Sequence, residues 1–173
     1  MGELILRAAT AADIPALSQL GSDSFVVKFG DMYKPEDLAA FLDGTHSPAA
    51  LVGELAHPER LYRLAEIDGA LVGYCKLAIP SSLTEYHDAA RPIEIKQLYT
   101  APGLTGKGIG AALMDWAMAE ARAYQADAIQ LSVWSGNTDA QRFYARYGFA
   151  KAADIEFWVG EQCDEEFLFA LRL

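Results

Sequence analysis

A glycine-rich loop at residues 104–110, LTGKGIG, constrains the fold of this chain more than any other segment. It holds three alternating glycines, one lysine and no acidic residue. A strand-like run, PIEIKQLYT, comes shortly before the loop, and a helix-like run, AALMDWAMAEA, follows it directly. Glycines at such a junction indicate a backbone turn that forbids a Cβ, or a partner that approaches the backbone closely.

Strands and helices alternate along the second half of the chain, as apolar periodicity, caps and turn residues indicate. Because a strand–helix–strand–helix order requires crossover connections, part of the sheet is expected to be parallel, which favours an α/β class. The first helix is expected to open with a capping box of Thr10 and Asp13 and to end just before Gly21. The expected strands are 3–8, a hairpin at 60–79 with its turn at 68–69, 92–100, 128–134, 153–160 and 165–173. The expected helices are 10–20, 35–44, 47–56, 109–124 and a short one within 137–149 that is capped by Asn137 and stopped at Gly148.

Length and charge limit the classes of function. The 173 residues fit one domain, 1–173, with a substantial core. No apolar run approaches the ~20 residues of a membrane span and the N-terminus lacks a signal-peptide pattern, so a cytoplasmic location is expected.

The net charge of −10 disfavours nucleic-acid and membrane partners and favours a cationic one. Two distant cysteines and three histidines without ligand-like spacing argue against a disulfide framework and a metal site: Cys75, Cys163, His46, His57 and His87.

Three interpretations of the glycine loop compete. The dinucleotide fingerprint G-x-G-x-x-G fits only in its relaxed form, because Ala111 stands third, and the strand at 128–134 ends without the required acid. A phosphate-binding Walker loop fails at Ala101 and Gly108, where it needs a glycine and a hydroxyl residue. A helix N-terminus nevertheless offers unpaired amides and partial positive charge to an anion, and Lys107 adds a point charge. A turn without any ligand is the remaining alternative.

The loop forms a pair with a second motif. The segment NTDAQRFYARYGF, residues 137–149, has the form N-x-x-A-x-x-F-Y-x-x-x-G-F. Together with IEIKQLYTAPGLTGKGIGAALM it resembles the GNAT superfamily of acetyl-CoA-dependent N-acetyltransferases, strongly over 92–149. The resemblance implies a single α/β (α+β) domain whose mixed, V-splayed sheet has about seven strands and helices on both faces. One departure is Thr105, where the family usually has glutamine or arginine.

The resemblance also implies where acetyl-CoA or coenzyme A would bind. Its pantetheine arm is expected in the split between the strands 92–100 and 128–134, paired with the backbone of the first strand and reached by the side chain of Asn137. Its pyrophosphate is expected on the amides of the glycine loop. The implied cofactor-binding residues are Leu98, Tyr99, Thr100, Thr105, Gly106, Lys107, Gly108, Ile109, Gly110, Ala111, Asn137 and Tyr144.

Two residues are candidates for acid–base catalysis. An alkyl ammonium with a pKa near 10.4 is neutral only about 0.04% of the time at pH 7, so a general base is valuable. Glu94 matches a glutamate that serves as the base in some branches of the family; the alternative is an outward-facing charge shared with Lys96. Tyr144 matches the usual acid that protonates the departing thiolate; the alternative is a core aromatic beside Phe143.

The resemblance implies a small-molecule amine as the acceptor, and the sequence constrains its identity only weakly. Phe25, Phe29 and Tyr33, expected between the first helices, would border the acceptor cleft in the family, or else pack in the core. Several segments are similar to PaiA-type polyamine acetyltransferases, and an acidic chain suits a polyamine. A peptide or protein N-terminus and an antibiotic amine stay open, as do a non-catalytic acetyl-CoA-binding module, a nicotinamide oxidoreductase and a homodimeric assembly.

Overall fold

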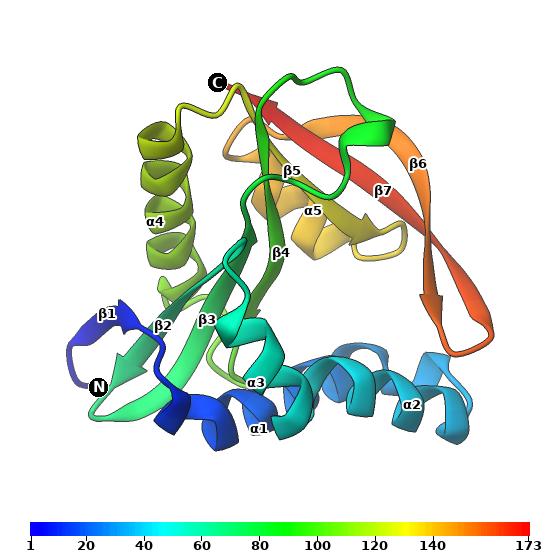
Figure 1. The fold of residues 1–173 in the computed structure, drawn as a ribbon. Helices are drawn as coiled ribbons and strands as arrows, with labels where there is room; N and C mark the ends of the chain where they lie inside the picture. Colours follow the sequence, from blue (N-terminus) through cyan, green and yellow to red (C-terminus); the bar gives the residue numbers. More distant parts are fainter.

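The protein folds into a seven-stranded sheet with five α-helices, as a computed structural model that describes residues 1–173 shows (Figure 1). None of its helices combines the length and the apolar character needed to cross a membrane. The strands are β1 (Leu4–Ala8), β2 (Arg60–Ile67), β3 (Ala70–Ala78), β4 (Pro92–Thr100), β5 (Ala128–Trp134), β6 (Ala150–Val159) and β7 (Gln162–Arg172). The helices are α1 (Ile14–Phe29), α2 (Pro35–His46), α3 (Pro48–Ala56), α4 (Ile109–Tyr124) and α5 (Thr138–Ala145).

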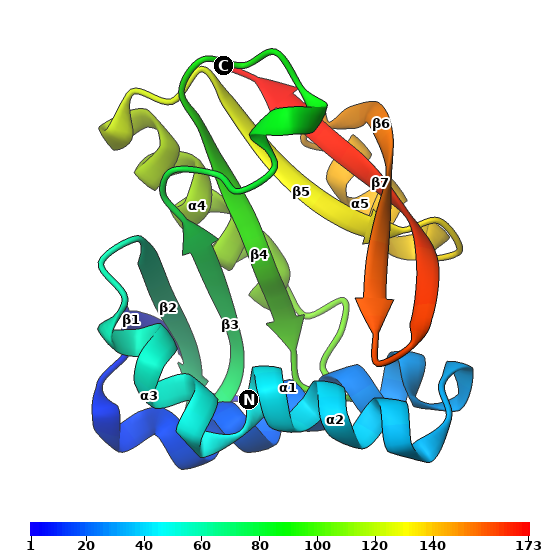
Figure 2. The same cartoon turned by 45° about the vertical axis from the view of Figure 1, so that its right-hand side comes forward.

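The sheet is mixed and splayed. Its strand order is β1-β2-β3-β4-β5-β7-β6, and every neighbouring pair is antiparallel except β4 and β5. These two parallel strands pair only where Pro92–Glu94 meets Ala128–Gln130. Beyond that short ladder they diverge, as Figure 2 shows. The expected α/β class, the parallel pair and the V-shaped sheet are therefore confirmed.

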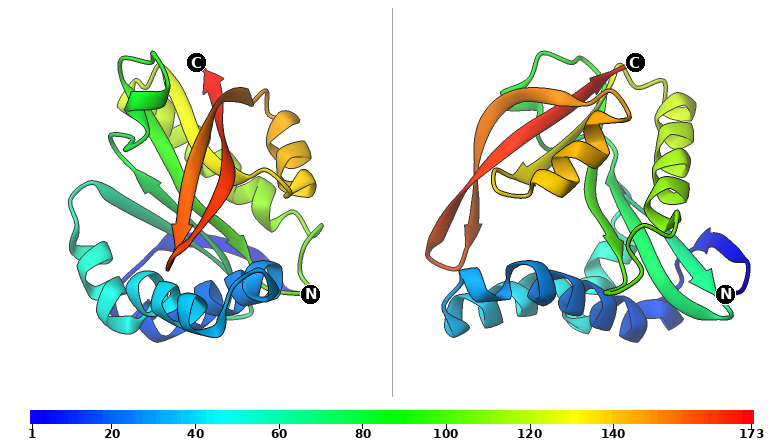
Figure 3. Two further views of the ribbon diagram at one scale, coloured as in Figure 1. Left: turned by 90° about the vertical axis from the view of Figure 1, so that its right-hand side faces the viewer. Right: turned by 180° about the vertical axis from the view of Figure 1, so that it is seen from behind.

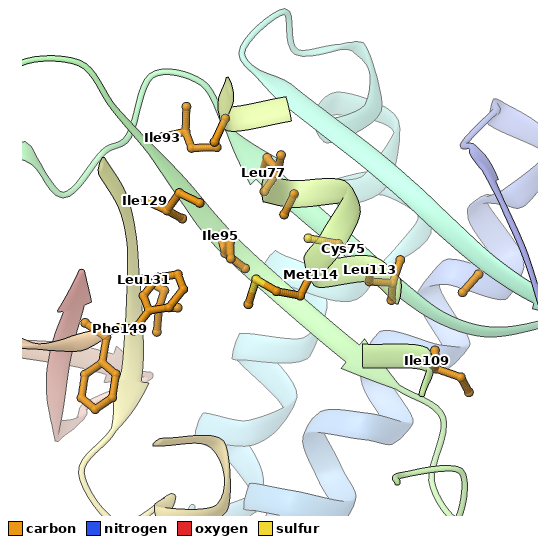
Figure 4. Packing of buried hydrophobic residues seen from close by; sticks show 14 of the residues in the cluster. Cys75, Leu77, Ile93, Ile95, Ile109, Leu113, Met114, Ile129, Leu131 and Phe149 are labelled. Carbon is orange, nitrogen blue, oxygen red and sulfur yellow. The ribbon is translucent and has the colours of Figure 1, made fainter. Parts of the chain in front are cut away.

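Successive side chains of the central strands belong to two different hydrophobic clusters, one on each face of the sheet. Ala65 and Cys75 belong to the larger cluster, which contains the apolar face of α4, whereas Leu64 and Tyr74 belong to the smaller cluster under α1 and α3. Figure 4 shows how side chains of α4 pack on the central strands in the larger cluster. Because successive residues of a strand face opposite sides, both faces of the sheet are covered.

The helices divide between these two faces. Helix α4 packs on β2, β3 and β4 (Figure 3), and side chains of α5 pack against the same cluster. On the other side α1 packs on β3 and β4, while α2 reaches β6 across the open end of the sheet (Figure 2). Phe41 of α2 and Phe157 of β6 have ring centroids 5.7 Å apart, and the amide of Glu161 donates to Asp37 Oδ1 at 3.2 Å. The α1–α2 segment thus bridges the two arms of the V.

Two expectations for the first helix are wrong. The helix does not end before Gly21 but continues to Phe29, so Phe25 and Phe29 lie on α1 and only Tyr33 lies between α1 and α2. Gly21 does not end the helix but lets the side chain of His46 pack closely against α1, because a Cβ at residue 21 would lie 2.5 Å from Nδ1 of His46. The expected cap is present one turn earlier than α1, where the amide of Thr10 donates to Asp13 Oδ2 at 2.7 Å.

Candidate functional site

The divergence of β4 and β5 leaves two strand edges without a protein partner. Past Glu94, β4 pairs only with β3 on its other side, through Gln97 to Thr100, and past Gln130, β5 pairs only with β7. Lys96 is the extra residue of a β-bulge in β4, because Lys76 pairs with Gln97 whereas Leu77 pairs with Ile95. An extended ligand can hydrogen-bond to such an exposed backbone edge as an added strand would.

A cavity of about 610 Å³ lies at this split. Such a volume suits a small-molecule site. Phe25, Phe29 and Tyr33 line it from the α1–α2 side, whereas Asn137 and Tyr144 line it from the start and the body of α5. The cavity is therefore bordered by elements from both faces of the sheet. The expected cofactor residues of β4 also line it: Leu98, Tyr99 and Thr100.

The glycine loop has the properties of an anion site. No backbone amide of residues 105–111 donates to a backbone carbonyl, and the first such donor is Ala112, which reaches Gly108 O at 3.0 Å. Gly106 and Gly108 have φ values of +78° and +81°, and a Cβ on either would meet nothing within 4 Å. Free amides over open space at the N-terminus of a 16-residue helix fit a phosphate group.

The members of the loop differ in what they can offer a ligand. Thr105 and Lys107 are exposed, whereas the side chain of Ile109 is buried in the core, so only its amide is available. Gly110 lies inside α4, where a Cβ would touch the ring of Phe143 at 3.5 Å. None of the residues 105–111 borders the 610 Å³ cavity, which reaches the neighbouring strand end at Thr100.

Asn137 caps the helix that forms the far wall of the split. Its Oδ1 accepts from the amide of Ala140 at 3.2 Å, as expected for an N-cap. The side-chain nitrogen of Asn137 has no hydrogen-bond acceptor in the protein, although the residue borders the cavity. It can therefore donate to a ligand without loss of the cap.

The carboxylate of Glu94 is buried and oriented. Only 5% of the residue is exposed, and it borders the cavity. Its Oε1 accepts from the amide of Ser82 at 3.0 Å and from the Ser82 hydroxyl at 2.6 Å. Its Oε2 lies 3.7 Å from Nζ of Lys96. Glu94 is thus not an outward-facing charge, although the expected proximity to Lys96 is present.

Tyr144 combines a packed ring with a free hydroxyl. The ring centroid lies 5.2 Å from that of Phe143 and 5.6 Å from that of Phe149, and the phenol makes no hydrogen bond within the protein. Burial raises the pKa of Tyr144 well above its usual range. The phenol therefore stays protonated near neutral pH, as a proton donor must, and its ring also packs as a core aromatic would.

Sequence reasoning missed two acidic residues of β7, Asp164 and Glu166. Both border the cavity, and each is only 8% exposed. Asp164 accepts from the hydroxyl of Tyr33 and from Nε2 of Gln162 at 2.8 Å. Burial, with a smaller contribution from Asp164, raises the pKa of Glu166 to about 8. The available signal was their i, i+2 spacing, which places both on one face of a strand.

The walls of the cavity carry more acidic than basic side chains. The positive charge of Lys76 is already compensated by an ion pair, because its Nζ lies 2.5 Å from Oε2 of Glu54. A cavity with an excess of acids attracts cations. The acids that border it are Glu54, Glu85, Glu94, Glu156, Asp164 and Glu166, and the bases are Lys28, Lys76 and Lys96.

A V-shaped mixed sheet with a free-amide loop beside its split defines the class of acyl-CoA-dependent acyltransferases. The chain belongs to the Acetyltransferase (GNAT) family, whose model matches residues 19–149. It is therefore an acetyl-CoA-dependent N-acetyltransferase, which confirms the resemblance found in the paired motifs.

Individual relatives agree with this assignment. The chain is 30% identical over 161 residues to an uncharacterised N-acetyltransferase of Lactobacillus delbrueckii subsp. lactis, covering 93% of this chain and 92% of the relative. It is 34% identical over 148 residues to an aminoalkylphosphonate N-acetyltransferase of Salmonella typhimurium, covering 85% of both. In fold it is similar to PaiA N-acetyltransferase of Thermoplasma acidophilum, solved in complex with coenzyme A, at a TM-score of 0.79 and 19% identity over 99% of both chains.

Proposed function

We propose that this protein transfers the acetyl group of acetyl-CoA to a primary amine that is positively charged in solution, with polyamines as the leading acceptor class. The observation that carries the proposal is the cavity at the split, which Glu94 borders from β4 and Tyr144 borders from α5. A base and an acid that border one cavity from two different elements suit a reaction in which one group loses a proton and another gains one.

The cofactor arrangement follows from the free backbone groups. The amides of residues 105–111 would hold the pyrophosphate, and the open edge of β4 at Leu98, Tyr99 and Thr100 would pair with the pantetheine arm, with Asn137 donating from the far wall. When bound, acetyl-CoA supplies an activated acetyl group as a thioester. The residues that would hold it act mainly through backbone amides. Thr105, in place of the family's usual glutamine or arginine, would therefore cost only one side-chain contact to the pyrophosphate.

Glu94 is proposed to accept the proton of the amine. The two donors of Ser82 hold one carboxylate oxygen in place. The second oxygen has only Lys96 Nζ nearby, at 3.7 Å, and is proposed to face the acceptor. An alkyl ammonium at pH 7 must give up a proton at a cost of about 4.6 kcal/mol before it can attack. A positioned base typically contributes about 10²–10⁴ in rate.

Tyr144 is proposed to donate a proton to the sulfur that leaves. Its raised pKa keeps the phenol protonated, and its packing against Phe143 and Phe149 fixes the ring. A thiol near pKa 8.5 leaves more readily when a nearby donor meets the developing negative charge.

The acceptor would lie against an aromatic wall. Phe25 has its ring centroid 5.2 Å from that of Phe29 and 5.9 Å from that of Tyr33, and all three border the cavity. Aromatic faces bind alkyl chains and cations. The acidic excess of the cavity favours a cationic acceptor over an anionic one.

The test is release of free thiol from acetyl-CoA with a panel of amines: an α,ω-diaminoalkane, a monoamine, an aminoalkylphosphonate, an aminoglycoside and a peptide with a free N-terminus. We expect the diaminoalkane to be acetylated fastest. The aminoalkylphosphonate is included because the Salmonella relative is named for it, and faster turnover with it would replace the polyamine assignment. Binding of acetyl-CoA without thiol release for any amine would favour a non-catalytic module.

A matched pair of variants tests the role of Glu94. Glu94→Gln should lower turnover at pH 7 by about 10²–10⁴, and a higher pH should recover part of the loss because more amine is then neutral. Glu165→Gln makes the same change at an exposed position of β7 that does not border the cavity, so its turnover should equal that of the wild type. Full activity of Glu94→Gln at neutral pH would exclude Glu94 as the base.

A further inference from the structure

The inner face of β7 carries two carboxylates that the proposed acid–base chemistry does not use. Asp164 and Glu166 both border the cavity, and more than nine-tenths of each is buried. No lysine or arginine forms an ion pair with either residue. Two buried acids side by side without a cation are costly, so their presence at a ligand cavity calls for a partner.

Glu166 is the member of the pair that lacks partners. Asp164 has two hydrogen-bond donors, the Tyr33 hydroxyl and the Gln162 side chain. Oε2 of Glu166 is enclosed and has none. The raised pKa of Glu166, about 8, has the same cause, since burial and the neighbouring Asp164 both oppose its negative charge. The positive charge of a ligand would offset both unfavourable effects.

Aromatic residues flank this acidic pair on β5 and on the α1–α2 segment. Trp134 is the register partner of Glu166 on β5, and its ring centroid lies 6.1 Å from that of Phe29 in an edge-to-face arrangement. Phe25 stacks on Tyr33, whose hydroxyl donates to Asp164. A wall of rings beside two carboxylates suits an alkyl ammonium, because the rings contact the methylenes and the acids contact the charge.

The acidic pair lies away from the proposed base. Glu94 is level with Gln130 of β5, whereas Glu166 is level with Trp134. The offset of four residues corresponds to about 13 Å along the strand. An acceptor that reaches both positions must therefore be extended, with one nitrogen at the reacting end and a second charge further along the cavity.

We propose that Asp164 and Glu166 bind a second ammonium group of the acceptor, so that the preferred substrate is an extended diamine or longer polyamine. The inference rests on the proposed function, because it assigns the far end of an acceptor whose near end is acetylated. It makes the β7 pair a determinant of specificity that selects doubly charged amines over amines with a single charge.

The experiment measures binding without turnover. Isothermal titration calorimetry with protein saturated by coenzyme A, which carries no acetyl group, compares 1,8-diaminooctane with octylamine. We expect the wild type to bind the diamine at least 10-fold more tightly than the monoamine. Glu166→Gln should abolish most of this preference while it leaves octylamine affinity unchanged. Glu165→Gln, the exposed neighbour, should keep the wild-type preference.

The outcomes separate this inference from the proposed function. A diamine preference that survives in both Glu166→Gln and Asp164→Asn would overturn the inference, as would an equal loss of affinity for both amines in Glu166→Gln. If thiol release from acetyl-CoA still occurs with diamines in that case, the proposed function stands. If the diamine preference depends on Glu166 but no amine is acetylated, the proposed acetyl transfer to such amines fails and the binding site stands.

Discussion

Replacement of Glu166 by glutamine should change how the stability of the protein depends on pH. The folded protein holds the Glu166 proton with a pKa of about 8, whereas the usual value is 4.5. Between these values the folded state binds more protons than the unfolded chain, so the free energy of unfolding falls as the pH rises. Each unit of difference corresponds to about 1.4 kcal/mol, which makes the loss between pH 5 and pH 8 about 3 kcal/mol.

Urea unfolding at a series of pH values measures this effect. The wild type should lose about 3 kcal/mol relative to Glu166→Gln from pH 5 to pH 8, equivalent to about 6–12 °C in melting temperature for a chain of this length. Other titrating groups affect both proteins alike and cancel in the difference. Glu165→Gln, which removes an exposed carboxylate, should run parallel to the wild type. Parallel curves for the wild type and Glu166→Gln would show that Glu166 ionises normally and refute the argument.

Three further predictions concern the glycine-rich loop, the proposed proton donor Tyr144 and the buried His46. Gly108→Val should weaken acetyl-CoA binding far more than Lys107→Ala, with Gly69→Val, at a similar positive φ in the β2–β3 turn, as the control for backbone strain; the opposite order would contradict binding by amides. Tyr144→Phe should lower turnover about 100-fold and leave acetyl-CoA affinity nearly unchanged in calorimetry, whereas unchanged turnover would make the residue structural. Burial and Lys76 lower the pKa of His46 to about 4, so about 3 kcal/mol of stability should be lost as the pH falls from 6.5 to 4; an NMR titration that gives His46 a pKa near 6.5 would exclude this loss.

Local patterns in the sequence were sufficient for most elements of the fold. The hairpin turn at Asp68 and Gly69, the cap at Asn137 and the free-amide loop around Gly108 each depend on residues within one turn of chain. The paired motifs at 92–149 also identify the family, whose model matches residues 19–149. Such features are local, so composition and spacing report them directly.

Contacts between segments distant in sequence determine the features that local patterns predicted wrongly or did not predict. Gly21 suggests a helix end in the sequence, yet α1 continues through it to Phe29. A glycine is needed there because His46, 25 residues away in sequence, packs where a Cβ would lie. The environment of Glu94 likewise depends on Ser82, which arrives from the connection between β3 and β4. Neither contact leaves a signal in the neighbouring residues.

The acidic wall of the cavity, which we propose binds the acceptor, depends on the tertiary structure. Alternation predicts that Asp164 and Glu166 share a face of their strand, but only the folded chain shows that this face borders the cavity and meets Tyr33 from the α1–α2 segment. The sequence by itself determined the family, the glycine-rich loop at 104–110 and the order of elements. The three-dimensional packing decided which charges are buried together, because burial depends on what the rest of the chain places on each face of the sheet.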